Sequence, residues 1–275
     1  MTILVTGGAG FIGSNFILNW LKNNDEKIIN IDNLTYAGNL ENLKTIKNSQ
    51  KYQFFHTDIA NSKVVAQILN ENKPRAILHF AAESHVDRSF HDPEIFIHTN
   101  IVGTSRLLEQ ALNFYKNLIE KDKKKFRFLH ISTDEVYGSL RPTDLPFKET
   151  NKYQPNSIYS ASKASSDHLV RAWNHTYGLP ILITNCSNNY GPYQFPEKLI
   201  PLSILKALNG SDIPIYGDGQ QVRDWLYVID HCNGIDSVLE KGCIGETYNI
   251  GGWNEKTNLD TVNIICNSLD EFKPK

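Results

Sequence analysis

The stretch "TILVTGGAGFIG", residues 2–13, decides the fold class of this chain. A short apolar run ends at glycines, and a helical pattern follows from about residue 13 to residue 23. Gly8, Gly10 and Gly13 form the pattern G-x-G-x-x-G, and Gly7 precedes Gly10 by three residues. Glycines in a turn between a strand and a helix let the backbone approach a pyrophosphate, which then lies at the positive end of the helix. The stretch therefore predicts a dinucleotide site.

The next strand-like run, "KIINID" at 27–32, ends in an acid where such a site requires one. Asp32 can accept hydrogen bonds from a ribose diol, and its charge would repel a 2′-phosphate. The sequence therefore predicts NAD rather than NADP as the cofactor. A glycine-rich turn without a ligand is the alternative, and the complete strand–helix–strand setting argues against it.

Continuous apolar runs alternate with amphipathic helical patterns through the first two thirds of the chain. Strands are predicted at 1–6, 27–32, 52–58, 75–82, 126–133 and 180–187, and helices at 62–72, 93–114 and 159–177. This alternation predicts an α/β protein with a Rossmann-type, doubly wound parallel sheet. Prolines and glycines become denser after about residue 186, which favours a smaller substrate domain. We expect an NAD-binding domain at 1–182 and 221–255, and a substrate-binding domain at 183–220 and 256–275.

The bulk composition narrows the choice of partners and location. The 275 residues are 40% hydrophobic and carry a formal charge of −2, which gives no electrostatic reason to expect nucleic acid as a partner. No apolar run is long enough to span a membrane. The four cysteines lack C-x-x-C spacing, and no export signal is recognisable, so we expect a reduced, cytoplasmic protein. The nine histidines show no ligand-like cluster, and we expect no metal.

Tyr159 and Lys163 have the spacing that places two side chains on one face of a helix. A phenol ordinarily has a pKa of ~10, and a nearby ammonium group together with an oxidised nicotinamide stabilises the phenolate. Such a tyrosine can remove a proton from a sugar hydroxyl while hydride leaves the same carbon. A surface pair of no catalytic meaning is the alternative, since the spacing alone arises easily by chance.

Thr133, Asp134 and Glu135 stand side by side where the strand predicted at 126–133 ends. One ionised and one protonated carboxyl group can act as base and acid in an elimination of water. On a continuing strand the two acids would point to opposite faces, so they can serve one substrate only if the chain turns there. Two solvated loop acids are the alternative.

Eight segments together resemble the nucleotide-sugar 4,6-dehydratases of the extended short-chain dehydrogenase/reductase family. They are "TGGAGFIGSNF", "DNLTYAGNLENL", "HFAAESHVDRS", "STDEVYG", "YSASK", "SNNYGPYQFPEKLIP", "PIYGDGQQVRDWLYV" and "YNIGGWNEKTN". The resemblance implies dehydration of dTDP-glucose to its 4-keto-6-deoxy form in the synthesis of deoxysugars such as rhamnose. NAD would take hydride from C4 and return it to C6, with Glu135 as base on C5, Asp134 as acid on the C6 oxygen and Thr133 as hydrogen-bond donor to the C4 oxygen.

The resemblance also implies two sets of binding residues and a homodimer through the helices near 93–114 and 159–177. The predicted NAD site consists of Gly7, Gly10, Phe11, Ile12, Gly13, Asp32, Leu34, Thr35, Asp58, Ile59, Ala81, Ala82, Thr99, Tyr159, Lys163 and Asn189. The predicted nucleotide-sugar contacts are Ser84, Thr133, Asn188, Lys198, Leu199, Pro214, Tyr216, Arg223 and Asn258. A guanidinium pairs well with a diphosphate, although Arg223 could instead form an ion pair with Asp218 or Asp224.

The sequence departs from the family pattern at its C-terminal end. Members of the family usually continue well beyond the point where this sequence stops, so we expect an incomplete substrate domain and weakened binding of the sugar nucleotide. Three other functions stay open at this point. A nucleotide-sugar 4-epimerase would share the glycines and the Tyr–Lys pair without needing the two acids. The same dehydration could act on UDP-glucose, and a non-catalytic NAD-binding protein would need no turnover.

Overall fold

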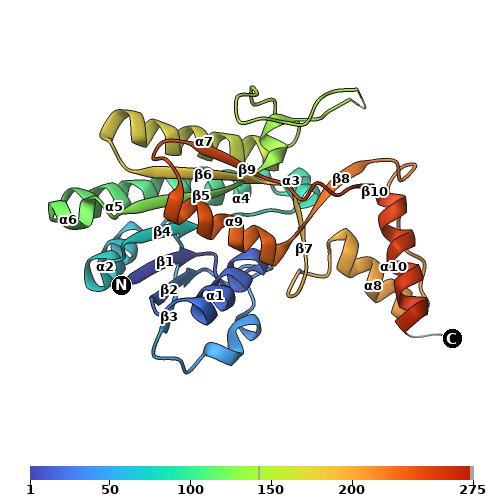
Figure 1. Cartoon of the computed structure of the whole chain (residues 1–275), viewed down its shortest axis with the longest axis horizontal. Helices are drawn as coiled ribbons and strands as arrows, with labels where there is room; N and C mark the ends of the chain where they lie inside the picture. The colour runs from blue at the N-terminus through green and yellow to red at the C-terminus, as the bar shows by residue number, and fades with distance from the viewer. Residues whose placement is uncertain (142, 273–275) are drawn as a thin grey trace.

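A seven-stranded parallel sheet forms the centre of the computed structural model, which describes residues 1–141 and 143–272 (Figure 1). The strand order is β3-β2-β1-β4-β5-β6-β9. The strands are β1 (Thr2–Thr6), β2 (Lys27–Asp32), β3 (Tyr52–His56), β4 (Ala76–His79), β5 (Arg127–Thr133), β6 (Ile181–Cys186) and β9 (Thr247–Ile250). The predicted doubly wound α/β fold and its first six strands are confirmed, and β9 is a seventh strand that the sequence patterns did not predict.

Helices cover both faces of this sheet and bury its apolar side chains. On one face, α2 (Ser62–Asn72), α5 (Thr104–Lys116) and α7 (Ile158–Tyr177) contribute residues to one apolar core. On the other face, α1 (Phe11–Asn23) and α9 (Val228–Lys241) pack on a second core (Figure 1). Each strand between these layers is buried on both sides, which is why the strands read as continuous apolar runs.

The long helix predicted at 93–114 is helical throughout but not uniform. It consists of α4 (Pro93–Phe96), a π-helical segment (Ile97–Gly103) and α5. The wider turn places Asn100 in the interior, where its amide bonds both backbone groups of Glu83 and the Ser162 hydroxyl. π-Helical turns occur often at functional sites. Here Asn100 in this turn connects α7 with the loop that follows β4.

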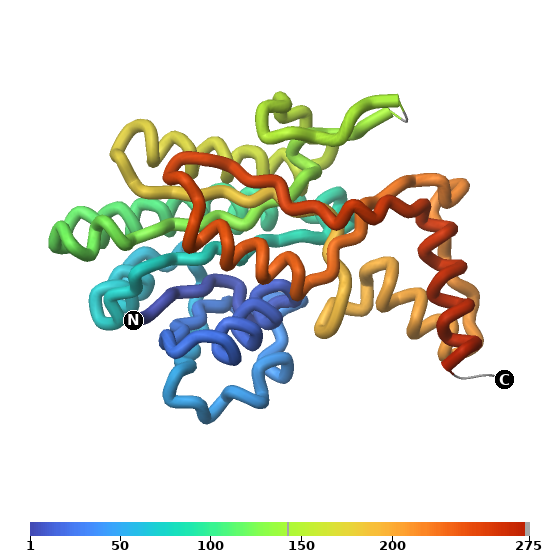
Figure 2. The backbone as a smooth tube through the Cα atoms, viewed as in Figure 1, coloured from blue at the N-terminus to red at the C-terminus, as the bar shows by residue number. Residues whose placement is uncertain are grey.

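A smaller unit lies beyond the carboxyl ends of the central strands. Its three-stranded sheet has the order β10-β8-β7 and pairs β8 (Val222–Tyr227) with β7 (Asn188–Tyr190) and β10 (Glu255–Thr257). Two helices, α8 (Leu199–Leu208) and α10 (Asn258–Phe272), pack against each other at the end of the molecule away from the N-terminus (Figure 2). Because the chain passes repeatedly between the two sheets, the predicted domain boundaries stay a prediction, and residues 273–275 lie outside the described residues.

Three global features complete the fold. No helix among the described residues combines the length and apolar character needed to cross a membrane. In the same part of the chain, no cluster of histidine, cysteine, aspartate or glutamate has the grouping that holds a metal ion. All four cysteines are free thiols.

Candidate active site

The glycine-rich loop between β1 and α1 leaves no room for a side chain at Gly7 or Gly13. Gly7 has a φ of +71°, and a Cβ there would lie 2.6 Å from the Ala81 backbone nitrogen. A Cβ on Gly13 would overlap the Gly7 carbonyl oxygen. The loop therefore lies flat against β4 and leaves the first turn of α1 accessible, which is the arrangement that receives a pyrophosphate.

Asp32 ends β2 beside this loop and is only 8% exposed. One carboxylate oxygen accepts the Ala9 N–H at 2.8 Å, and the other accepts the Leu34 N–H at 2.8 Å. Burial raises the pKa of Asp32, and these two backbone hydrogen bonds oppose that effect. The carboxylate thus fixes the loop as well as presenting an acceptor to the cleft.

One cleft of about 550 Å³ runs across the carboxyl ends of the central strands and toward the smaller unit. Ligands bind at this edge in open α/β sheets. All but two of the residues predicted from the sequence line it. The cleft-lining residues among them are Gly7, Gly10, Phe11, Ile12, Gly13, Asp32, Thr35, Asp58, Ile59, Ala81, Ala82, Ser84, Thr99, Thr133, Glu135, Tyr159, Lys163, Asn188, Asn189, Lys198, Leu199, Pro214, Tyr216, Arg223 and Asn258.

Leu34 and Asp134 are the two predicted residues that do not line the cleft. Leu34 has a positive φ of 51° and contributes its N–H to Asp32, so its backbone supports the site from behind. Asp134 lies behind Thr133, whose hydroxyl contacts its carboxylate at 3.4 Å. The roles assigned to both residues stay predictions.

Tyr159 and Lys163 stand in the first two turns of α7, which begins with a capping box between Ser157 and Ser160. Lys163 is buried, and its ammonium donates to the carbonyl oxygen of Ile131 at 2.9 Å. Burial lowers the pKa of Lys163 and raises that of Tyr159 well above its ordinary value, with Glu135 adding to the latter effect. Lys163 is therefore held away from water on the same helical face as Tyr159, where a charge acts more strongly than in solvent.

The chain turns directly after β5, as the two adjacent acids require. A 3₁₀ turn covers Asp134–Tyr137, and the Thr133 hydroxyl accepts the Glu135 N–H at 3.2 Å as its cap. Gly138 ends the turn with a φ of 100°. The tight turn keeps both carboxyl groups near the end of the strand, with Glu135 facing the cleft and Asp134 set back.

The two carboxyl groups differ in their electrostatic surroundings. Burial, and then the charge of Glu135, raises the pKa of Asp134 to about 7. Burial also raises the pKa of Glu135, but the cations Arg223 and Lys198 oppose the change. The site therefore favours a protonated Asp134 beside an ionised Glu135, which is the combination that acid–base chemistry needs.

Basic side chains from the smaller unit close the far end of the cleft. Lys198 donates to the Ser84 carbonyl at 3.1 Å. Arg223 donates to the Val222 carbonyl at 3.0 Å, and within residues 1–141 and 143–272 it forms no ion pair with Asp218 or Asp224. Asp224 instead accepts the N–H groups of Gly252 and Asn254. The guanidinium is thus available to an anionic ligand.

Several cleft residues were missed by the sequence interpretation. Tyr36, Glu83, Cys186 and Glu197 line the cleft, and the Arg88 guanidinium lies 3.8 Å from the centre of the Tyr36 ring. All four lie within or next to segments that the sequence had marked, yet apolar patterning gives no signal for such polar contacts. His79 is a buried residue of β4, hydrogen-bonded to Thr6 and Thr104.

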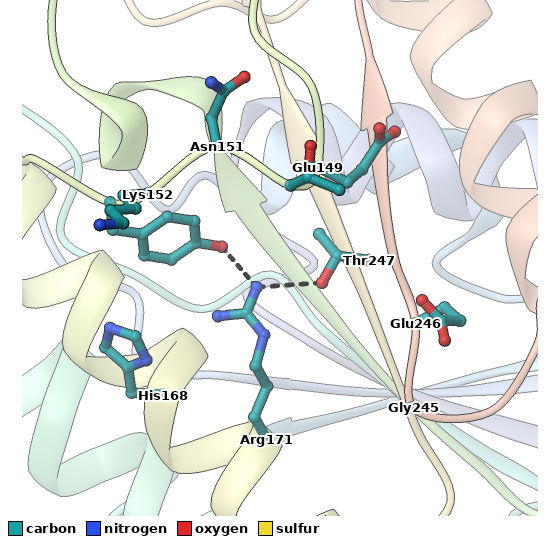
Figure 3. A pocket seen from close by; sticks show the side chains of 10 residues that line it. Glu149, Asn151, Lys152, His168, Arg171, Gly245, Glu246 and Thr247 are labelled. Carbon is teal, nitrogen blue, oxygen red and sulfur yellow. Dashed lines mark hydrogen bonds between the residues drawn. The ribbon is translucent and has the colours of Figure 1, made fainter.

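A second pocket, of about 510 Å³, lies on the outer side of α7 and β9. Arg171 lies in its centre and donates to the Tyr153 hydroxyl at 2.7 Å and the Thr247 hydroxyl at 3.0 Å (Figure 3). Glu149 and Glu246 contribute the opposite charge at its rim. No residue predicted from the sequence lies in this pocket.

The glycine-rich loop and the Tyr–Lys pair in one cleft, with Glu135 facing it and Asp134 set back beside it, define a dinucleotide-dependent enzyme of the short-chain dehydrogenase type. Residues 4–274 match the model of the family described as GDP-mannose 4,6 dehydratase, and the chain belongs to this family.

Individual relatives narrow the similarity further. The dTDP-glucose 4,6-dehydratase of Shigella flexneri is 58% identical over 283 residues, which cover 100% of this chain and 78% of that protein. A crystal structure of dTDP-glucose 4,6-dehydratase from Streptomyces venezuelae with NAD bound has a TM-score of 0.91 and 46% identity, covering 98% of this chain and 81% of that one. A UDP-glucose 4-epimerase from Thermotoga maritima reaches 0.87 at 29% identity, covering 100% of this chain and 84% of the other. The fold is therefore shared with epimerases, while the sequence similarity is to dehydratases.

Proposed function

We propose that this chain is an NAD-dependent dTDP-glucose 4,6-dehydratase, a hydro-lyase that forms the 4-keto-6-deoxy sugar nucleotide. The observation that carries the proposal is the pair of unlike carboxyl groups at the end of β5: Glu135 lines the cleft that also holds Tyr159 and Lys163, and Asp134 lies next to it, set back behind Thr133. An epimerase has no step that needs this acid pair. The 58% identity to a dTDP-glucose 4,6-dehydratase supports the same choice.

The cleft fits NAD as the resident cofactor. Any side chain at Gly7 or Gly13 would meet backbone atoms, so the loop is kept free of Cβ atoms where a pyrophosphate would lie against α1. Asp32 would accept the ribose hydroxyls, and Asn189, held by its hydrogen bond to His231, would bind further along the cleft. Bound NAD supplies the acceptor for the C4 hydride and returns the same hydride to C6.

The first chemical task of the protein is removal of the C4 hydroxyl proton. Tyr159 is the base, because it lines the cleft one helical turn before the Lys163 ammonium. Burial raises the pKa of Tyr159. A positive charge beside the phenol, from Lys163 and from oxidised nicotinamide, would oppose that effect. Thr133 stands beside them and donates a hydrogen bond to the C4 oxygen.

The second task is loss of water across C5 and C6. Glu135 faces the cleft and removes the C5 proton, which the C4 ketone has made acidic. Asp134, with a pKa raised to about 7, donates its proton to the departing C6 hydroxyl. Its carboxyl group lies 3.4 Å from the hydroxyl of Thr133, which lines the cleft. Arg223 and Lys198 bind the diphosphate and keep Glu135 ionised.

The proposal is tested by incubating the purified chain with NAD and dTDP-glucose, and in parallel with UDP-glucose. We expect the 4-keto-6-deoxy sugar, seen by its ultraviolet absorbance in alkali, from dTDP-glucose and much less from UDP-glucose. Formation of a 4-epimer would identify an epimerase instead. Binding of NAD without any sugar product would favour a non-catalytic protein.

We also propose a homodimer and a cytoplasmic location. The outer face of the 93–116 helix exposes the apolar side chains of Ile95, Ile97 and Val102 beside α7. Such a face is commonly covered by a second subunit. Free cysteines suit a reducing compartment.

A further inference from the structure

A buried carboxylate lies one helical turn after the lysine of the Tyr–Lys pair. Asp167 and Lys163 are four residues apart in α7, so their side chains lie on the same face of the helix. Asp167 has 0% exposure and Lys163 has 3%. An ionised carboxylate in such a place is costly unless charges and donors compensate it.

Two side chains from other parts of the chain, Tyr153 before α7 and His130 on β5, lie against this carboxylate. The Tyr153 hydroxyl donates to one oxygen at 2.8 Å, and the other oxygen lies 3.2 Å from Nε2 of His130 on β5. Tyr153 in turn accepts hydrogen bonds from Asn185 on β6 and from Arg171 in the outer pocket (Figure 3). Asp167 therefore joins the outer pocket to the floor of the active site without contact to the cleft itself.

The surroundings of His130 and Asp167 determine which of the two is charged. Burial lowers the pKa of His130 to about 4, and the Lys163 charge adds to that effect, so the imidazole is neutral. Burial raises the pKa of Asp167, but His130, Lys163 and Ser132 outweigh it and the carboxyl is ionised. The titratable groups facing Lys163 are Asp167 on α7, Cys186 on β6, His79 and His130 on β4 and β5, and Tyr159.

Only one of these groups supplies a permanent negative charge. Burial raises the pKa of the Cys186 thiol to about 12, so it is neutral. Both histidines are neutral, and Tyr159 is protonated at rest. Burial works to remove the proton from Lys163, and Asp167 is the first group that opposes it.

We propose that Asp167 is a positioning residue for the dehydratase reaction: its buried carboxylate keeps Lys163 in the ammonium form and so keeps Tyr159 able to act as a base. The inference rests on the proposed function for its catalytic consequence, but the state of Lys163 is a property of the protein alone. A purely structural carboxylate would need only its hydrogen bonds, and an amide of the same shape can still accept the one from Tyr153 through its single oxygen. The charge is what distinguishes the two roles.

Three variants separate charge from hydrogen bonding. Asp167→Asn removes the charge and keeps the shape, Asp167→Glu keeps the charge, and Tyr153→Phe removes the hydrogen bond to Asp167 but leaves the carboxylate. In the pH profile of kcat/KM for dTDP-glucose, we expect Asp167→Asn to move the alkaline limb toward lower pH by about one unit or more, since a unit charge at helical i,i+4 distance is worth that much. The limbs of the other two variants should stay within about half a unit of wild type.

A second measurement does not depend on activity. The side-chain NMR resonance of Lys163, assigned with Lys163→Arg, is titrated in the NAD-loaded protein. We expect an ammonium group at the pH of maximal turnover in wild type and in Asp167→Glu, and titration at lower pH in Asp167→Asn.

A neutral Lys163 in wild type, or an unchanged titration in Asp167→Asn, would overturn the proposal, as would equal shifts of the limb in Asp167→Asn and Tyr153→Phe. If Asp167→Asn fails to fold, the wild-type and Asp167→Glu titrations still decide. If wild type forms no 4-keto product, the proposed function fails while the NMR result still judges the charge of Lys163.

Discussion

At the residue scale, the site depends on how the chain makes two adjacent acids unlike each other. Glu135 faces the cleft near two cations, whereas Asp134 is set back behind Thr133 and is neutral below a pH of about 7. Sequence reasoning predicted the pair and the turn that it needs. It could not predict which acid would be protonated, because that depends on burial and on the cations of the smaller unit.

The raised pKa of Asp134 predicts how the elimination step depends on pH. Asp134 must carry a proton to act as the acid, so its rate should fall about tenfold per unit once the pH exceeds about 7. Rapid mixing with dTDP-glucose measures this as slower consumption of NADH after it forms. The preceding oxidation at C4 does not involve Asp134 and serves as the control. An elimination rate independent of pH between about 6 and 9 would contradict the role.

The same group makes a prediction for stability. Its folded pKa lies above the unfolded value, so the folded state loses stability as the pH rises from about 4 and the loss is complete above about 7. Asp134→Asn removes this loss. The gain in stability is the free energy of unfolding of the variant minus that of wild type. This gain should be larger at pH ~8 than at pH ~5 by about 1–2 kcal/mol, after allowance for solvent around the half-buried carboxyl. Urea unfolding at both pH values measures it, and equal differences would refute the shift.

At the element scale, two glycines of the loop between β1 and α1 serve different purposes: Gly7 is needed for the fold of the loop, and Gly10 for the approach of the cofactor. Gly7 needs its positive φ and its contact with β4, whereas a Cβ on Gly10 would meet only the Gly7 carbonyl at 3.3 Å. Gly7→Ala should therefore destabilise the protein by about 2 kcal/mol or more. Gly10→Ala should cost less than about 1 kcal/mol yet weaken NAD binding about tenfold or more, because its methyl group occupies the pyrophosphate approach.

Calorimetric NAD titration and thermal unfolding of both variants check this difference. Gly178→Ala provides a control for positive φ without a close contact, because nothing lies within 4 Å of a Cβ there. Equal NAD affinity for Gly10→Ala and wild type would show that the pyrophosphate does not lie against this loop.

The elements themselves were predictable where their patterns are local. The apolar runs of β1 to β6 and the stretch around the glycines predicted six strands, the first helices and the cofactor edge. β9 has only four residues, and it is a strand because it pairs with β6. The sequence of those four residues does not indicate this pairing. The π-helical segment at Ile97–Gly103 was missed for a similar reason, since the side chain of Asn100 and its partners, not periodicity, decide it.

At the scale of the whole molecule, the exposed apolar face of the 93–116 helix beside α7 predicts a dimer. If Val102 lies in a dimer interface, Val102→Glu should convert the dimer to a monomer, because an unpaired charge in an apolar interface is costly. Sedimentation velocity measures the mass. Lys121→Glu, a substitution in the short exposed helix α6 (Glu120–Lys123) before β5, is the matched control and should leave the dimer intact. A monomeric wild-type protein would contradict the proposal.

The smaller unit shows the limit of prediction from sequence at this scale. Pro214, Tyr216, Arg223 and Asn258 were assigned to the nucleotide sugar only through resemblance, yet the fold brings all four to the same cleft as the cofactor loop. Their common location depends on β7, β8 and β10, which come from distant parts of the chain. No local pattern could supply that arrangement.

One bound nicotinamide is proposed to oxidise the sugar at C4 and to stay reduced while the acid pair removes water. It then returns to NAD when the hydride is transferred to C6. The most direct test is the double variant Asp134→Asn/Glu135→Gln mixed with dTDP-glucose under single-turnover conditions. The account predicts that NADH absorbance appears and persists, while no 4-keto-6-deoxy product forms. Normal product formation by this variant would contradict the account.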